Sequence, residues 1–371
     1  MKAIVEQTRI RKRRTSTRLL VTLVVFAILL TLGLINLYSA AGEATLRTQL
    51  RHLIPALLLF VGIGWVIPLR MINTYSYIFY SLTVFFLIAV LVLGYIAGGA
   101  QRWLILGPLR FQPSELAKLS IALFVAKHFY NNRTKLSYQL TELWPVLIAV
   151  GAYFVLIFIQ PDFGTAGVCL LIALTQVAFI KVSISRGMLL SLLFSGLGMI
   201  AMGWQFLLRP YQKLRILNLF NPALDPSGSG YNSLQSLVAV GSGGQWGKGF
   251  LHGTQAQLQF LPARQTDFIF SVFAEEQGFW GGALIFVLFA ILSYAALEIA
   301  REAKDTFNTL LAIGIGALIF LEFFINVAMV IGIFPVVGMP LPFFSYGGSF
   351  LLTICAAMGL LVAVERDTLR S

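Results

Sequence analysis

Asp267 is the residue whose type and position most favour chemistry. It ends a long polar stretch and directly precedes an apolar run, within the sequence LPARQTDFIFSVFAEEQGFWGGALIF. A carboxylate at such a boundary loses part of its hydration, which raises its pKa and suits it to act as a general base. The alternative role is a cap for the helix that follows, with Arg264 as an ion-pair partner.

A second cluster of ionisable residues surrounds a Pro-containing stretch: Arg102, Arg110, Glu115 and Lys118. Arg102 is followed by Trp103, and an arginine fork beside an aromatic ring suits phosphate recognition. Glu115 and Lys118 are spaced i to i+3 at the start of a predicted helix. For this pair a structural ion pair, worth about 0.5 kcal/mol if exposed, is favoured over a substrate contact.

Further charged residues lie near the same predicted face. Asp162, in QPDFGT, is expected to cap the next helix, with a chemical role as the alternative. Glu275 and Glu276 continue into an apolar run and should face the interior of the bundle or a wet cavity. Positive charge comes from Lys213, Arg215, Lys248 and Arg264, which suits an anionic ligand, although contact with lipid headgroups is an equal alternative for Lys213 and Arg215.

The elements that must position these residues are membrane helices. The chain is 58% hydrophobic and only 11% charged, with a mean hydropathy of +0.84. This composition predicts an all-α polytopic membrane protein, because segments of about 20 apolar residues span a bilayer as helices. The predicted spans are 19–40, 53–69, 74–95, 115–131, 144–160, 164–181, 187–207, 270–298, 307–333 and 347–365.

The distribution of Lys and Arg predicts the orientation and the domains. Seven cations before the first span hold residues 1–18 in the cytoplasm, and an even number of spans returns the tail, 367–371, to the same side. Residues 19–366 then form one transmembrane domain. Its long extracytoplasmic loop, 208–267, should carry short amphipathic helices near 214–220 and 234–240. The net charge of +12 therefore reflects topology and attraction to membrane lipids, not nucleic-acid binding.

Metal, disulfide and nucleotide chemistry have no support in the pattern. Cys169 and Cys355 fall inside apolar runs, the three histidines are scattered, and no P-loop is present. No cofactor is required. A divalent cation, Mg²⁺ or Mn²⁺, bridging Asp267 and an anionic substrate stays an open alternative, although no acidic cluster demands one.

Four stretches carry a resemblance to a known family. They are GAQRWLILGPLRFQPSELAK, QPDFGT, DPSGSGYNSLQSLVAVGSGGQWGKGFLHGTQAQLQFLPARQTDFIFSVFAEEQGFWGG and NVAMVIGIFPVVGMPLPFFSYGGS. Through them the chain resembles the SEDS family (shape, elongation, division and sporulation) over nearly its whole length. The segments GTQAQLQFLPARQTDF and VVGMPLP are more similar to the elongation branch of that family than to its division branch.

The resemblance implies a ten-helix glycosyltransferase that polymerises lipid II at the outer face of the cytoplasmic membrane. It also implies a partner, a class B penicillin-binding protein with transpeptidase activity. The family's essential acid matches Asp267, and its substrate-contact cations match Arg102 and Lys118. Another family cation matches Arg51, where His52 replaces the glutamine that usually follows. Together with residues singled out above from the sequence, the predicted substrate-binding residues are Arg51, Arg102, Trp103, Arg110, Glu115, Lys118, Asp162 and Lys248.

The chemistry of that reaction suits these residue types. Asp267 would remove the proton from the acceptor hydroxyl, while Arg102, Lys118 and Arg51 would stabilise the departing pyrophosphate. The loop from Pro335 to Ser349 would help to shape the groove, because its Pro and Gly residues free backbone groups that need a polar cavity. The alternatives are a lipid II flippase or transporter, a division-branch polymerase and a scaffold without catalysis.

Overall fold

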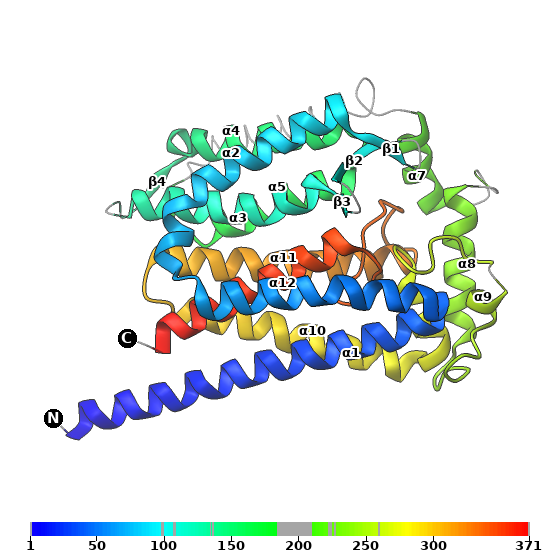
Figure 1. Cartoon of the computed structure of the whole chain (residues 1–371), viewed down its shortest axis with the longest axis horizontal. Coiled ribbons are helices and arrows are strands. Elements are labelled where there is room, and N and C mark those ends of the chain that lie inside the picture. Colours follow the sequence, from blue (N-terminus) through cyan, green and yellow to red (C-terminus); the bar gives the residue numbers. More distant parts are fainter. Residues whose placement is uncertain are drawn as a thin grey trace.

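The fold is an elongated helical bundle with most helices running along its long axis (Figure 1). A computed structural model describes residues 2–97, 100–106, 109–133, 135, 137–183, 210–221, 225, 228–258 and 260–369. The short helices α7 (Pro210–Phe220), α8 (Ser229–Ser242) and α9 (Thr254–Gln257) lie at one end of the bundle, and both termini lie at the other (Figure 1). These ends are called the loop end and the terminal end below.

Two helices joined at a glycine begin the chain. Helix α1 (Lys2–Val61) contains Gly42 at φ 76° and ψ −178°, and the chain reverses direction there (Figure 1). A positive φ is accessible to glycine without the clash that a Cβ would cause. The two halves of α1 hold the predicted spans 19–40 and most of 53–69. A π-helical turn, η1 (Gly62–Val66), and Pro68 then lead into α2 (Leu69–Leu93).

The remaining elements follow in chain order: β1 (Tyr95–Ala97), β2 (Ala100–Leu106), β3 (Leu109–Phe111), α3 (Pro113–Asn131), β4 (Tyr138–Gln139), the 3₁₀ turn η2 (Leu140–Leu143), α4 (Trp144–Ile159), α5 (Phe163–Ala178), β5 (Val182–Ser183), α7 (Pro210–Phe220), α8 (Ser229–Ser242), α9 (Thr254–Gln257), α10 (Ile269–Glu302), α11 (Thr306–Val330) and α12 (Gly348–Leu369). Helices α7 and α8 include the predicted amphipathic segments.

A small sheet departs from the all-α prediction. Strands β1, β2 and β3 form an antiparallel sheet in that order, and β4 pairs with β5 in parallel. Each strand has at most seven residues, and the sequences that separate the strands are Gly-Gly and Gly-Pro, so the segment resembles a loop in sequence. The sheet matters because β2 carries Arg102 and β3 carries Arg110.

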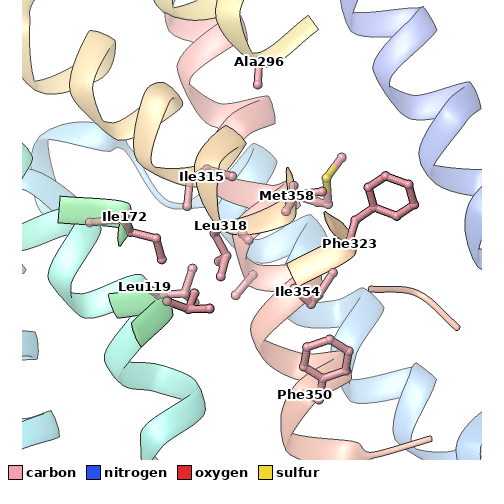
Figure 2. Packing of buried hydrophobic residues seen from close by; sticks show 14 of the residues in the cluster. Leu119, Ile172, Ala296, Ile315, Leu318, Phe323, Phe350, Ile354 and Met358 are labelled. Atoms are coloured by element: carbon pink, nitrogen blue, oxygen red, sulfur yellow. The ribbon is translucent and has the colours of Figure 1, made fainter. Parts of the chain in front are cut away.

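Helix α11 lies at the centre of the hydrophobic core. Ile315 and Leu318 of α11 are buried between α3, α5, α10 and α12, where Leu119, Ile172, Ala296 and Ile354 also point inward (Figure 2). In contrast, α2 and α4 expose large apolar side chains along their length. Such faces are stable in hydrocarbon and unfavourable in water.

The described residues include six helices long and apolar enough to cross a membrane: Thr17–Val66, Leu69–Leu93, Leu140–Ile159, Ile269–Glu302, Thr306–Val330 and Gly348–Leu369. The shorter α5 is also apolar. The predicted spans coincide with helices or half-helices, except that 187–207 lies outside the described residues. The total of ten spans and the side on which the termini lie stay predictions.

Helix α10 is interrupted at Gly278, where φ is 65° and ψ is −163°. The loop between α8 and α9 packs against this break and supplies hydrogen bonds to it. The Phe279 N–H donates to the Gly244 carbonyl at 2.9 Å, and the Lys248 N–H donates to the Glu275 carbonyl at 3.0 Å. The loop is thereby fixed to the start of α10, the segment that follows Asp267.

The close backbone contact predicts that Gly247→Ala destabilises the protein. A Cβ at Gly247 would lie 2.1 Å from the Glu276 carbonyl oxygen, and the residue has a φ of 78°. Overpacking and the positive φ together should cost about 2–4 kcal/mol. The midpoint of thermal unfolding in detergent should fall clearly, whereas Gly241→Ala, which meets open space in the preceding helix, should leave it unchanged. Equal midpoints for both variants would contradict this account.

Candidate active site

Asp267 lies in the turn that enters α10, at the loop end of the bundle. The N-cap of α10 is Phe268, and no side chain caps the helix. The structure therefore does not support the capping alternative for Asp267. Its side chain is half-buried. The carboxyl is therefore partly shielded from water and does not cap the helix.

Asp267 belongs to a loop of residues 263–268, called the Asp267 loop. This loop is held in place together with residues 335–347, called the proline loop. The buried Asn326 amide of α11 donates to the backbone carbonyl of Asp267 at 2.8 Å and to that of Met339 at 2.6 Å. Ser345 Oγ donates to the Thr266 carbonyl at 2.7 Å. Both loops are thus anchored to each other and to the central helix.

The proline loop passes close to the Asp267 carboxyl at Gly338. A Cβ placed on Gly338 would lie 3.4 Å from Asp267 Oδ2, and the φ of this glycine is 73°. Glycine is the residue that adopts this φ without strain. The loop was predicted to help shape a groove, and its glycine leaves room beside the carboxyl.

The electrostatic surroundings raise the pKa of Asp267 to about 6, chiefly because burial disfavours the charged carboxylate. The negative charge of Asp162 raises this pKa further, while Arg215 and Arg102 lower it. A carboxyl with a pKa near 6 is ionised at neutral pH yet basic enough to accept a proton. Asp267 therefore has the properties of a general base.

Arg102 binds the turn between α4 and α5, and Asp162 ends this turn as the N-cap of α5. Arg102 Nε donates to the Gln160 carbonyl at 2.9 Å, and its Nη2 donates to the Pro161 carbonyl. Asp162 accepts from the Thr165 N–H at 3.4 Å and caps α5, which confirms the capping prediction. Arg102 is therefore held beside the site by backbone carbonyls, with its charge acting on Asp267.

Trp103 and Arg110 are placed by the small sheet. Trp103 pairs with Tyr95 across β1 and β2 and is half-buried, while Arg110 pairs with Ile105 across β2 and β3 and is exposed. The Arg110 carbonyl accepts a hydrogen bond from Ser349 Oγ at 3.0 Å. The sheet is thus joined to the start of α12, and the predicted substrate contacts of both side chains stay predictions.

Arg51 and Lys248 differ in the contacts that their side chains make. Arg51 is exposed, and its side chain makes no hydrogen bond or ion pair among the described residues. Lys248 Nζ lies 2.6 Å from Glu275 Oε1, a buried carboxylate as predicted. Arg264 donates to the Ala40 carbonyl at 2.7 Å. Lys248 and Arg264 therefore fix loops to helices, and Arg51 is open to solvent or ligand.

Lys118 is fully buried between two glutamates. Its Nζ lies 2.8 Å from Glu115 Oε2 and also forms an ion pair with Glu322 of α11. The predicted i to i+3 pair is present, but the small value for an exposed pair does not apply because both partners are buried. The two glutamates compensate the charge of Lys118 within the bundle. Contact between Lys118 and a substrate stays a prediction.

Asn326 and Glu322 are important residues that the sequence analysis missed. Both lie inside the predicted span 307–333, four residues apart and on one helical face. Polar residues in a membrane span carry a desolvation cost and usually have partners. Their i to i+4 spacing was the signal that could have found them.

An apolar groove of about 240 Å³ lies beside the site, between α5, α7 and the proline loop. Arg215 lines it and donates to the Val336 carbonyl at 3.2 Å. Among the described residues, no group of three His, Cys, Asp or Glu side chains could hold a metal ion. The site thus combines a carboxyl, two arginines and an adjacent apolar surface.

Residues 18–369 match the family described as "Cell cycle protein", which groups FtsW, RodA and SpoVE. The chain belongs to this family. It is 38% identical over 346 residues to "Peptidoglycan glycosyltransferase MrdB" of Escherichia coli strain K12, covering 92% of each chain. The resemblance inferred from the sequence is therefore confirmed.

Solved structures of FtsW/RodA/SpoVE relatives share the fold. One belongs to a peptidoglycan synthase complex described as coordinating polymerization and crosslinking; it has a TM-score of 0.79 and 30% identity, over 93% of this chain and 97% of that one. RodA, a rod shape determining protein of Thermus thermophilus, has a TM-score of 0.67 and 28% identity, over 93% and 96%. With its apolar helices, this member of the family is an integral multi-pass membrane protein.

The anchoring of the Asp267 loop in this family member predicts unequal effects for two adjacent substitutions. Ser345→Ala removes the acceptor of the Leu341 N–H and the donor to the Thr266 carbonyl, so it should cost about 1–3 kcal/mol of stability. Tyr346→Phe should change stability by less than about 0.5 kcal/mol, because the hydroxyl makes no hydrogen bond in the described part of the chain. Thermal unfolding in detergent checks both, and an unaffected Ser345→Ala would contradict the anchoring role.

Proposed function

We propose that the chain polymerises lipid II into glycan strands, with Asp267 as the general base. The observation that carries this proposal is the half-buried Asp267 carboxyl, whose pKa is raised to about 6 beside two arginines. Chain growth by glycosyl transfer needs a base at the acceptor hydroxyl and positive charge near the leaving pyrophosphate. The loop end of the bundle offers both.

The chain is an enzyme of the peptidoglycan glycosyltransferase class. Family membership over residues 18–369 and 38% identity to MrdB support this activity. The same similarity supports the elongation branch over the division branch. Lipid II as the substrate, and undecaprenyl pyrophosphate as the product released, are the parts that we propose.

The reaction follows from the placement of the charged groups. The Asp267 carboxylate takes the proton of the acceptor's sugar hydroxyl as that oxygen attacks the anomeric carbon of the donor, and the bond to pyrophosphate breaks. Arg102 and Arg215 supply positive charge next to this step, and exposed Arg51 is a further candidate for the pyrophosphate. Lys118 acts through the position of α3, since two glutamates surround it.

The membrane orientation and the partner complete the proposal. The loop end faces the outside of the cytoplasmic membrane, and both termini face the cytoplasm, as the cations of residues 1–18 favour. A class B penicillin-binding protein crosslinks the strands, which is supported by the similarity to a chain of a peptidoglycan synthase complex. A divalent cation bound between Asp267 and the pyrophosphate stays an alternative, with Asp267 as its carboxylate ligand.

The transporter alternative has less support from the positions of the buried charges. A transporter is expected to hold ionisable groups near the middle of the bilayer. Glu115 and Lys118 lie in the first two turns of α3, and Asp267 precedes α10, so all three are near the loop end. This arrangement favours an enzyme at the membrane surface.

Asp267→Asn tests the proposal directly. The variant keeps the size of the side chain and removes the base, so the rate of glycan polymerisation should fall about 10²-fold to 10⁴-fold. The assay uses purified lipid II and the full chain with its penicillin-binding partner, and strands are resolved on a gel. Glu43→Gln, an exposed carboxylate elsewhere, is the matched control and should retain activity. Full activity of Asp267→Asn would remove this residue from the chemistry.

The pH dependence should report the same group. Because the ionised carboxylate is the active form, the rate should rise about tenfold per pH unit below about pH 6 and level off above it. Arg102 lowers the pKa of Asp267, so Arg102→Gln should move the midpoint to higher pH. Initial rates of polymerisation across pH 4.5–8.5 measure this, with Arg47→Gln as the control. A midpoint that does not move in Arg102→Gln would contradict the electrostatic assignment.

A further inference from the structure

A charged pocket of about 490 Å³ lies at the terminal end of the bundle, opposite the candidate active site. Its walls come from η1, the first turns of α2 and α11, and the last turns of α12. Trp65 and Tyr130 also line it. Trp and Tyr are the aromatic residues that membrane proteins place at the depth of the lipid headgroups.

The acidic side chains of the pocket are already paired. Asp305 caps α11 by accepting from the Asn308 N–H at 2.9 Å. Asp367 lies 3.1 Å from Lys304 Nζ and accepts from Asn308 Nδ2 at 3.2 Å. The guanidinium of Arg366 lies over the Trp65 ring. Two carboxylates therefore face three cations, which leaves an excess of one positive charge.

Arg70 supplies that excess charge. Its side chain lines the pocket, is exposed, and makes no hydrogen bond or ion pair in the part of the chain that the structure describes. Arg70 lies in the first turn of α2, whose N-cap, Pro68, offers no side-chain acceptor. A planar guanidinium and free backbone N–H groups at a helix N-terminus both favour a phosphate group.

An apolar groove continues from this pocket along the same helix. Ile67 lines both cavities, and the residues directly after Arg70 line the groove, which has a volume of about 390 Å³. Its other walls are apolar side chains of α1, α3 and α12, including Leu59, Leu116, Leu119 and Leu360. A cationic pocket joined to an apolar groove matches a molecule with an anionic head and a hydrocarbon tail.

We propose that these two cavities bind one anionic phospholipid. Its phosphate lies at Arg70 and the α2 N-terminus, and an acyl chain lies in the groove between α2 and α3. A free phosphate would use the pocket alone and gain nothing from the groove. The bound lipid would fill a space between helices that meet the central core, so it would act as a structural ligand far from Asp267.

Native mass spectrometry of the full chain in detergent tests this proposal. Dioleoyl phosphatidylglycerol should give one saturable adduct, and zwitterionic dioleoyl phosphatidylcholine should bind at least fivefold more weakly. Arg70→Gln should lower the occupancy by phosphatidylglycerol at least fivefold. The control is Arg47→Gln, an exposed arginine near the loop end that lines neither cavity. Because Arg70 is exposed, its substitution should leave the thermal midpoint unchanged in detergent without added phospholipid.

A competition arm separates a lipid from a free anion. Inorganic phosphate at millimolar concentration, and the soluble headgroup glycerophosphoglycerol, should displace little of the bound phosphatidylglycerol. Displacement by either compound at that concentration would show that the groove contributes nothing and would overturn the proposal. Equal occupancy in wild type and Arg70→Gln would overturn it as well. Neither result depends on the polymerase activity.

Discussion

The geometry of the candidate active site depends on one buried amide, that of Asn326. Its two N–H groups donate to carbonyls of two different loops, at Asp267 and at Met339. Met339 is buried and Asp267 is half-buried, so loss of the amide donor to these carbonyls would be costly in a membrane protein. The position of the Asp267 carboxyl is therefore set by α11, a helix of the buried core.

The burial of charge near the loop end follows the same physical rule. Lys118 is stable inside the bundle because Glu115 and Glu322 surround it, and this triad joins α3 to α11. Among the described residues, Asp267 has no such ion-pair partner, and the nearby charges that act on its carboxyl are those of Arg215, Asp162 and Arg102. The buried positive charge of Lys118 is thus neutralised by two glutamates that join helices, whereas the Asp267 carboxyl is left able to exchange a proton.

Particular residues show how far sequence alone could reach. Asp267 could be predicted because it lies at the boundary between a polar loop and an apolar run, and Asp162 because Asp commonly caps helices. The pairing of Lys118 with Glu322 joins positions 204 residues apart, so no local spacing indicates it. The strands around Arg102 are too short, and the sequences that separate them too rich in glycine, to be told from a loop. Long-range packing decided both features.

Binding of lipid II to Asp267→Asn, measured alongside wild type by native mass spectrometry, tests most directly whether Asp267 acts in chemistry. Its carboxyl neither caps α10 nor holds the loops together, because the anchoring bonds use its backbone carbonyl. The account therefore predicts affinity within about threefold of wild type and an unchanged thermal midpoint, in a variant whose polymerisation rate is at least about 10²-fold lower. Loss of binding together with loss of stability would show instead that Asp267 has a structural role.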